Sequence, residues 1–285
     1  MNITLRRGRS DDAQRAGSIC YEAFKVLAEH HRFPPDFPSA EVAVGVLSSL
    51  LARPDIYSVV AEIDGRLVGA NFLWENATIA GVGPITIDPE VQNSQIGKEL
   101  MNDVLDRART RDVPGVRLVQ AAYHNRSLSL YAKLGFAVRE PLAVLQGKPL
   151  GLEIPGFKVR QATERDLDIC NKLCRKVHRH ERSHELLDAV KRGSASVVEH
   201  DGRITGYATM IGFFGYAVGE SNEDIKALIG AATSIAGPGL IVPSRNAELF
   251  RWCLNKQMRV VQPMTLMSLG LYNEPSGAFL PSVIY

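Results

Sequence analysis

Apolar and polar positions in the first half of the chain follow two periods, one typical of strands and one of helices. Short apolar runs predict strands over residues 3–7, 57–63, 66–75, 80–87, 116–123 and 136–145. Apolar positions at helical spacing predict helices over residues 11–27, 40–52, 96–110 and 126–133. An early antiparallel hairpin and later helical crossovers indicate the α/β fold class with a mixed sheet.

The same succession of patterns occurs a second time. Residues 5–13, which lead into a predicted helix, have the layout of residues 159–167. Residues 58–69 and 196–206 each contain two apolar strands joined by an Asp-Gly turn, the strongest short signal for a hairpin. Two shorter matches follow in the same order: residues 79–83 with 235–239, and 117–120 with 259–262. The chain is therefore predicted to be a tandem duplication.

The boundary between the two copies is predicted in a stretch rich in glycine and proline. Residues 146–156 contain turn-forming residues and show no apolar period. We predict a first domain over residues 1–148 and a second over 157–285. Two domains agree with the number expected for 285 residues.

The composition narrows the class of protein. The 33 basic and 31 acidic residues leave a net charge of +2, and the arginines are scattered, so no nucleic-acid partner is expected. No apolar run approaches the length that spans a membrane, so we expect no membrane association and a cytoplasmic location. The four cysteines are too few and too unevenly placed for a disulfide framework, and we interpret them as reduced thiols.

One strand-to-helix junction carries the first chemical signal. Residues 85–100 run from a predicted strand through a short polar loop into a predicted helix. Such a junction directs several backbone N–H groups and the positive end of a helix dipole to one place, which makes it an anion site. Gly97 at the turn lets a pyrophosphate approach the backbone. The alternative is an ordinary connection between a strand and a helix.

A second segment, residues 123–136, contains Asn125 and the run Leu130-Tyr131-Ala132-Lys133-Leu134-Gly135-Phe136. Together with the loop around Gln92 and Gly97, it resembles the acyl-CoA site of the GNAT (Gcn5-related N-acetyltransferase) superfamily. The resemblance covers essentially all of the first half and extends more weakly, through the duplication, to the second. It implies two tandem GNAT-like domains, and an enzyme that transfers an acetyl group from acetyl-CoA to an amine acceptor without a metal.

The resemblance also implies roles for individual residues. The main chain of Ile85, Thr86 and Ile87 would pair with the pantetheine arm like an added strand. A loop that begins at Gln92 would hold the pyrophosphate through the amides of Asn93, Ser94, Gln95, Ile96, Gly97 and Lys98. Asn125 and Ser127 would contact the cofactor from the next strand and helix. Tyr131 would lie near the thioester sulfur, where a phenol can protonate the departing thiolate.

Two features of this site are left open by the sequence. Gln95 stands where the family has the first glycine of its loop, so binding there requires that the local φ suits a side chain. The base that deprotonates the attacking amine is not assigned. Glu75, Glu22 and the pair His30-His31 are candidates that are equally well explained as surface or structural residues, and none is included in the predicted site.

The second copy departs further from the family. We expect its equivalent junction at residues 239–250, where no glycine follows Pro243. No segment resembling residues 125–131 follows its last recognisable strand. The second domain is therefore expected to be degenerate and without a cofactor.

Two other functions remain as alternatives. A non-catalytic acyl-CoA-binding or interaction protein would account for Gln95 and for the unassigned base. A zinc hydrolase would use His180-Glu181-x-x-His184, a spacing that on a helix places two imidazoles one turn apart. The zinc interpretation is disfavoured by four surrounding cations, Arg175, Lys176, Arg179 and Arg182, which oppose a dication. The sequence determines neither the acceptor nor whether the chain forms a homodimer.

Overall fold

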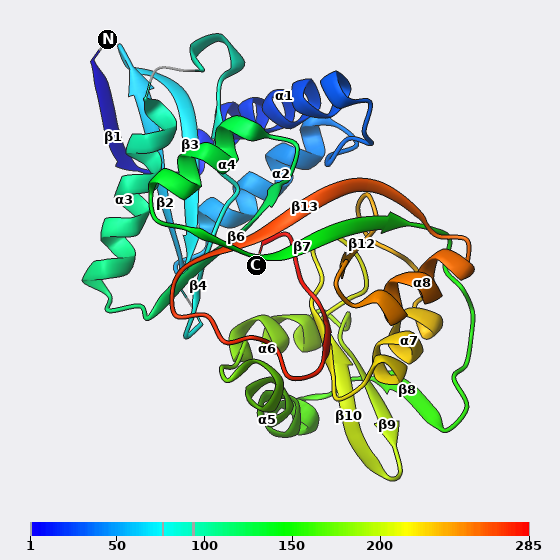
Figure 1. The fold of residues 1–285 in the computed structure, drawn as a ribbon. Helices are drawn as coiled ribbons and strands as arrows, with labels where there is room; N and C mark the ends of the chain where they lie inside the picture. The colour runs from blue at the N-terminus through cyan, green and yellow to red at the C-terminus, as the bar shows by residue number, and fades with distance from the viewer. Residues whose placement is uncertain (1, 76, 93–94, 285) are drawn as a thin grey trace. The chain divides into compact units, whose positions relative to one another are not determined.

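The protein is described from a computed structural model, which covers residues 2–75, 77–92 and 95–284. The chain forms two compact units (Figure 1). The first contains the chain up to Leu118 together with Ser129–Leu134, and the second contains Val119–Leu128 and Gly135–Val283. Each unit is described separately below.

The first unit is built on a mixed sheet. The strands β1 (Ile3–Arg7), β2 (Ile56–Ile63), β3 (Arg66–Trp74) and β4 (Ala80–Val82) follow one another in chain order, each antiparallel to the next. β6 (Gly115–Ala121) then pairs with β4 in parallel. A parallel pair needs a long crossover, which contains the helix α3 (Ile96–Thr110). The predicted mixed α/β fold class is confirmed.

Two further helices, α1 (Ala13–His31) and α2 (Ala40–Ala52), pack against each other and against the sheet. They meet at Gly17, where a Cβ would lie 2.4 Å from the Cα of Val44, so the close approach requires glycine. α2 begins where the Ser39 hydroxyl accepts the N–H of Val42, as an N-cap does. The predicted bounds of α2, α3 and β1 are confirmed.

The strand predicted over residues 80–87 is in fact two strands, β4 and β5 (Thr86–Ile87). Val82 lies opposite Leu73 and Thr86 opposite Ala70, so β3 advances by three residues while its partner advances by four. The extra residue makes a bulge, and Gly83 there has a φ of 132°. The Trp74 indole N–H donates to the Gly83 carbonyl at 2.8 Å.

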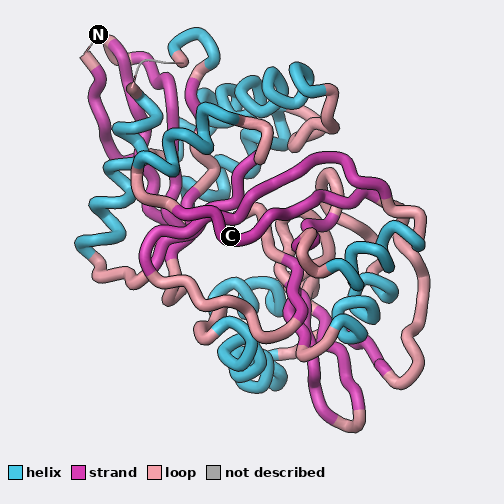
Figure 2. The backbone as a smooth tube through the Cα atoms, viewed as in Figure 1, coloured by secondary structure: helices cyan, strands magenta, loops and turns pink. Residues whose placement is uncertain are grey.

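The second unit contains two groups of strands. One antiparallel sheet has the order β14 (Ala278–Leu280), β11 (Ala217–Gly219), β10 (Arg203–Ala208), β9 (Ser196–His200), β8 (Phe157–Gln161). In the other group, β7 (Ala137–Gln146) lies between β13 (Arg259–Gly270) and β12 (Leu240–Pro243). Figure 2 shows β7 and β13 as two long strands side by side. The helices are α5 (Leu167–His178), α6 (Ser183–Lys191), α7 (Asn222–Ala231) and α8 (Ala247–Asn255).

The elements from β8 to β13 repeat the order of those from β1 to β7. In this order β11 corresponds to the interrupted strand formed by β4 and β5, β12 corresponds to β6, and β13 corresponds to β7. Two of the four sequence matches are therefore wrong. Residues 235–239 precede β12 and form no strand equivalent to β4, and residues 259–262 lie in β13 whereas residues 117–120 lie in β6.

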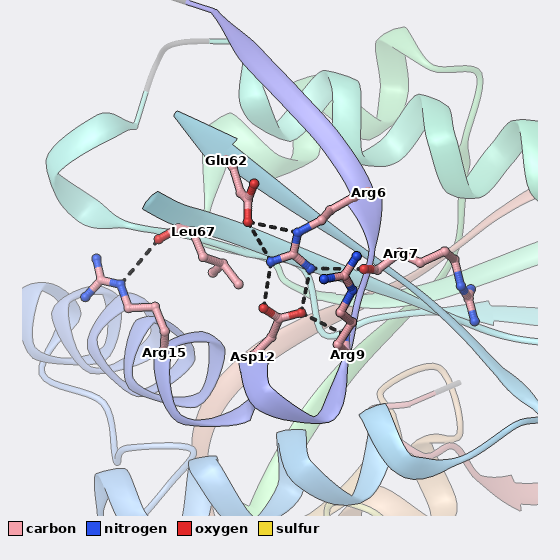
Figure 3. A network of polar contacts seen from close by, with 7 residues as sticks. All are labelled: Arg6, Arg7, Arg9, Asp12, Arg15, Glu62 and Leu67. Carbon is pink, nitrogen blue, oxygen red and sulfur yellow. Dashed lines mark hydrogen bonds and ion pairs between the residues drawn. The ribbon is translucent and has the colours of Figure 1, made fainter. Parts of the chain in front are cut away.

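The repeat extends to a network of polar contacts in the first unit (Figure 3). The Arg6 guanidinium donates to both carboxylate oxygens of Asp12 at 2.8 Å and to Glu62 at 2.6 and 2.8 Å. Asp12 also accepts the N–H of Arg9 at 2.7 Å. The network joins β1, the turn after it and β2.

The second unit contains the same network. Arg160 donates to both oxygens of Asp166 at 2.8 Å and to Glu199 at 2.7 Å, and Asp166 accepts the N–H of Thr163 at 2.8 Å. These residues lie on β8, the turn after it and β9. Since the same atoms make the same bonds in equivalent elements, the duplication is one of structure as well as of sequence.

The paired networks give a matched test of stability. Asp12→Asn and Asp166→Asn are each expected to lower the free energy of unfolding by about 2 kcal/mol, because each loses charge-assisted hydrogen bonds. The arginine bonds hold the pKa of both carboxyls below their ordinary value of 3.8. This stabilisation is therefore complete above pH 4 and decreases as the pH falls below it. Urea unfolding from pH 7 to pH 2 measures it, and a deficit that stays constant with pH would contradict the explanation.

The units do not coincide with the two sequence repeats. The predicted boundary falls between β7 and β8, yet β7 pairs with strands of the second repeat.

The four cysteines are free and buried, as predicted, and burial raises the pKa of Cys170 and Cys253 to about 12. Within the described residues, no helix is long and apolar enough to cross a membrane.

Candidate functional site

The strand β5 has one edge that none of the described strands covers. Among the described strands, β5 pairs with β3. The Asp88 N–H donates to the Val68 carbonyl at 2.8 Å, so the preceding residue, Ile87, occupies a non-hydrogen-bonded pair with Gly69. In such a pair the N–H and C=O groups point away from the neighbouring strand. Ile87 therefore directs both groups to the edge where an extended ligand can add as a strand.

The helix α3 begins close to this edge with an unusual N-cap. Gln95 has a φ of 64°, in the left-handed region, and its side chain makes no capping hydrogen bond. Its carbonyl accepts the N–H groups of Lys98 and Glu99 at 2.9 and 3.1 Å. The N–H groups of Ile96 and Gly97 precede any intrahelical acceptor. The N-terminus of α3 therefore has the features of an anion site, although the Lys98 amide predicted to take part already has a partner.

Gly97, in α3, lies against one residue of β5 and one residue of the next helix. A Cβ at this position would lie 3.0 Å from Cδ1 of Ile87 and 3.5 Å from Cδ2 of Leu130. Leu130 belongs to α4 (Asn125–Lys133), and the next residue, Tyr131, is buried. The structure thus brings Ile87, Gly97 and the part of α4 that carries Tyr131 together within the first unit.

Other predicted site residues lie elsewhere. Asn125 and Ser127 are in the first turn of α4, within the second unit. The N–H of Ser127 donates to Nδ1 of His124 at 3.0 Å and its hydroxyl bonds to the same atom, so Ser127 takes part in capping α4. Gln92 places its side-chain amide 3.5 Å from the Ile87 carbonyl. Asn93 and Ser94 lie outside the described residues.

The structure shows where the candidate bases for deprotonating the amine lie. The Glu75 carboxylate accepts hydrogen bonds from Arg107 at 2.9 and 3.0 Å and lies 3.3 Å from Arg111, with its side chain 7% exposed. Two guanidinium groups therefore hold the Glu75 carboxylate in place, as expected for a structural residue. His30 and His31 are in the last turn of α1, and Glu22 is exposed on the same helix.

The equivalent junction of the second copy was predicted wrongly. Element order makes β11 and α7 the counterparts of β5 and α3, and two residues, Glu220 and Ser221, separate them. Residues 88–95 occupy that place in the first copy. The Asp224 carboxylate, 1% exposed, accepts the N–H and the hydroxyl of Ser221, each at 2.8 Å. The second copy therefore lacks the loop, and a carboxylate of its own closes the helix N-terminus.

The second copy also lacks the tyrosine. α8 is the counterpart of α4, and both helices have nine residues. The seventh residue is Tyr131 in α4 and Cys253 in α8, both buried. No phenol is therefore present at this position of the second copy.

The zinc pattern does not have the geometry it requires. α5 ends at His178 and α6 begins at Ser183, so His180 and Glu181 lie between helices while His184 lies within one. The two histidines of the pattern are therefore not one helical turn apart. Among the described residues, no group of three or more His, Cys, Asp or Glu side chains could hold a metal ion.

Comparisons with known proteins identify the family of this chain. The sequence profile of the acetyltransferase (GNAT) family matches residues 23–136. A relative named IAA acetyltransferase, from Azospirillum brasilense, is 30% identical over 131 residues, which are 45% of this chain and 85% of that protein.

Solved structures extend the likeness of fold to nearly the whole chain. A protein from Pyrococcus horikoshii assigned as an acetyltransferase is similar with a TM-score of 0.74 and 18% identity, over 99% of this chain and 92% of that chain. A tandem GNAT protein from the clavulanic acid biosynthesis pathway has a TM-score of 0.57 and 14% identity, over 94% and 98% of the two chains.

The chain therefore belongs to the acetyltransferase (GNAT) family, in a tandem-domain architecture. Its activity is that of an acyl-CoA-dependent N-acetyltransferase.

The left-handed N-cap gives a prediction for the loop. Gln95→Gly is expected to raise the free energy of unfolding by about 0.5–1 kcal/mol, because a side chain at positive φ costs more than the added freedom of glycine in the unfolded chain. Acetyl-CoA affinity should change by less than about threefold, since the backbone amide stays in place. Gln257→Gly is the control, because Gln257 has a φ of 62° in the second unit. Loss of binding in Gln95→Gly alone would show that the Gln95 side chain contacts the cofactor.

Proposed function

We propose that the first repeat is the catalytic copy and transfers the acetyl group of acetyl-CoA to an amine. One observation carries this proposal: the edge of β5 that no described strand covers lies next to a helix N-terminus at which the Gln95 side chain makes no capping hydrogen bond. Such an arrangement suits a ligand with an extended amide arm followed by a pyrophosphate. In the second repeat the corresponding loop is absent and Asp224 closes the helix N-terminus.

In the proposed site, the main chain of Ile85–Ile87 pairs with the pantetheine arm. The pyrophosphate lies at the amides of the loop that begins at Gln92 and ends in the first turn of α3. Contacts of the cofactor with Asn125 and Ser127 stay predictions made from the family resemblance. The amine attacks the thioester carbonyl, and the N–H of Ile87, which points to the uncovered edge, stabilises the oxyanion. The nitrogen–carbon bond forms, the carbon–sulfur bond breaks, and Tyr131 gives its proton to the thiolate. The proton that the amine nitrogen loses passes through solvent and restores the phenol of Tyr131.

The acceptor is proposed only as an amine. The relative from Azospirillum brasilense is named for acetylation of IAA. Acceptor specificity depends on loops outside the cofactor motifs, so this name does not transfer directly. A cytoplasmic location stays a prediction made from the sequence.

Calorimetric titration with acetyl-CoA tests the site. One acetyl-CoA is expected to bind per chain, and ligand at about 100 times its dissociation constant should stabilise the unit that binds it by about 2.7 kcal/mol. Release of CoA thiol in the presence of a panel of amines then tests turnover. Two equal sites per chain would show that the second repeat binds as well. Binding without release of thiol above the buffer rate for any amine would favour the non-catalytic alternative.

A further inference from the structure

The residue directly after β5 is a buried carboxylate with partners on both of its oxygens. Asp88 is 5% exposed. One oxygen accepts the N–H of Glu90 at 3.1 Å and caps the short turn Pro89–Val91, and the other accepts a hydrogen bond from Arg15. Asp88 thus determines the direction in which the chain leaves β5 towards the cofactor loop.

Arg15 connects three elements of the first unit. It lies in the first turn of α1, and its Nε donates to the Leu67 carbonyl at the start of β3 at 3.3 Å. Its Nη2 donates to the carboxylate of Asp88. A second cation, Arg66, is 3.8 Å from the same oxygen and is more than half exposed. Arg15 is therefore the main ionic partner of Asp88.

We infer that Arg15 is a positioning residue for acetyl-CoA binding, which acts by holding the Asp88 carboxylate that caps the turn at the start of the cofactor loop. This inference rests on the proposed function. Two guanidinium bonds attach Arg15 at once to β3 and to Asp88, so the end of β5 and the start of the turn are held together. Without the cation, a carboxylate with this little exposure loses a charged partner, and the turn loses part of what fixes its direction.

The second repeat supplies a natural comparison. Glu220 directly follows β11, and its N–H donates to the Thr205 carbonyl at 3.0 Å, as that of Asp88 does to the Val68 carbonyl. Its carboxylate is paired with Arg203 at 2.7 Å and with Lys176 at 2.8 Å, and these bonds lower the pKa of Glu220 to about 2. In both repeats, the residue directly after the strand therefore forms an ion pair. In the second repeat, no cofactor loop follows this residue.

The experiment compares Arg15→Met with Lys176→Met, which removes a cation from the equivalent carboxylate of the second repeat. Arg15→Met is expected to raise the dissociation constant and the KM for acetyl-CoA about tenfold, within the range of coupling found for contacting residues. Its kcat at saturation should change by less than about twofold, because Arg15 touches no reacting atom. Lys176→Met is expected to leave both binding constants unchanged.

Further variants separate positioning from general stability. Arg15→Lys keeps the cation and is expected to recover most of the affinity. Asp88→Asn should weaken acetyl-CoA binding about as much as Arg15→Met. The double variant should bind acetyl-CoA no more weakly than either single variant, since both substitutions break the same interaction. An Arg15→Met protein that is less stable but binds acetyl-CoA with wild-type affinity would overturn the inference. Failure of the wild-type protein to bind acetyl-CoA would overturn the proposed function itself.

Discussion

Tyr131→Phe is expected to lower kcat and kcat/KM together by about 10²-fold, while the dissociation constant of acetyl-CoA barely changes. A proton donor helps a thiolate leave only as the carbon–sulfur bond breaks, so its removal affects the transition state and not the bound ground state. General acids typically contribute about 10²–10⁴ in rate, and CoA thiolate is already a fair leaving group, which favours the lower end. Steady-state kinetics with an accepted amine measure the effect.

The control for this variant is Tyr57→Phe. Tyr57 also lies in the first unit, and its hydroxyl donates to Asp103 at 2.8 Å. Loss of this hydrogen bond in Tyr57→Phe should lower the melting temperature of the protein and leave turnover per folded molecule unchanged. If Tyr131→Phe behaves in the same way, with lower stability and wild-type turnover, Tyr131 is a core residue and another group protonates the sulfur.

Gly97→Pro is expected to abolish acetyl-CoA binding. Proline has no N–H, so one amide is removed from the helix N-terminus, and its ring adds atoms where a Cβ alone would lie 3.0 Å from Ile87. The cost to the fold is limited because a proline is tolerated in the first turn of a helix. Calorimetric titration of the folded variant, verified by circular dichroism, measures the loss.

Glu223→Pro is the matched control for the glycine variant. Glu223 is the second residue of α7, as Gly97 is of α3. Because Asp224 and Ser221 already cap α7, this variant should bind acetyl-CoA like the wild type. Unchanged affinity in Gly97→Pro, or a large loss in Glu223→Pro, would place the cofactor elsewhere.

Periodicity located most elements of the first repeat because helices and strands bury one face at a regular spacing. The bounds of α2 and α3 are as predicted. The division of β4 from β5 was missed, since a bulge depends on pairing with β3 and leaves the run of apolar residues unbroken. The sequence did contain a signal, because Gly83 and Pro84 interrupt the predicted strand.

Short matches were less reliable for aligning the two repeats. The Asp-Gly turns identified equivalent hairpins because both positions of such a turn need a positive φ, which Asp64-Gly65 and Asp201-Gly202 both have. The tetrapeptide match joined β6 to β13, which are not equivalent. Apolar strands are built from few residue types, so short matches between them recur by chance. Element order and strand pairing are more reliable because the whole fold determines them.

The sequence by itself determined the family and the duplication, and it predicted the segments of the proposed site, because these depend on local patterns within a few residues of one another. Only the tertiary structure showed that Glu75 is paired with two arginines and that Arg15 holds Asp88. These contacts join side chains from separate elements, up to 73 positions apart in the chain for the last pair. No local period or spacing records such a distance, since it arises only when the sheet and its helices pack.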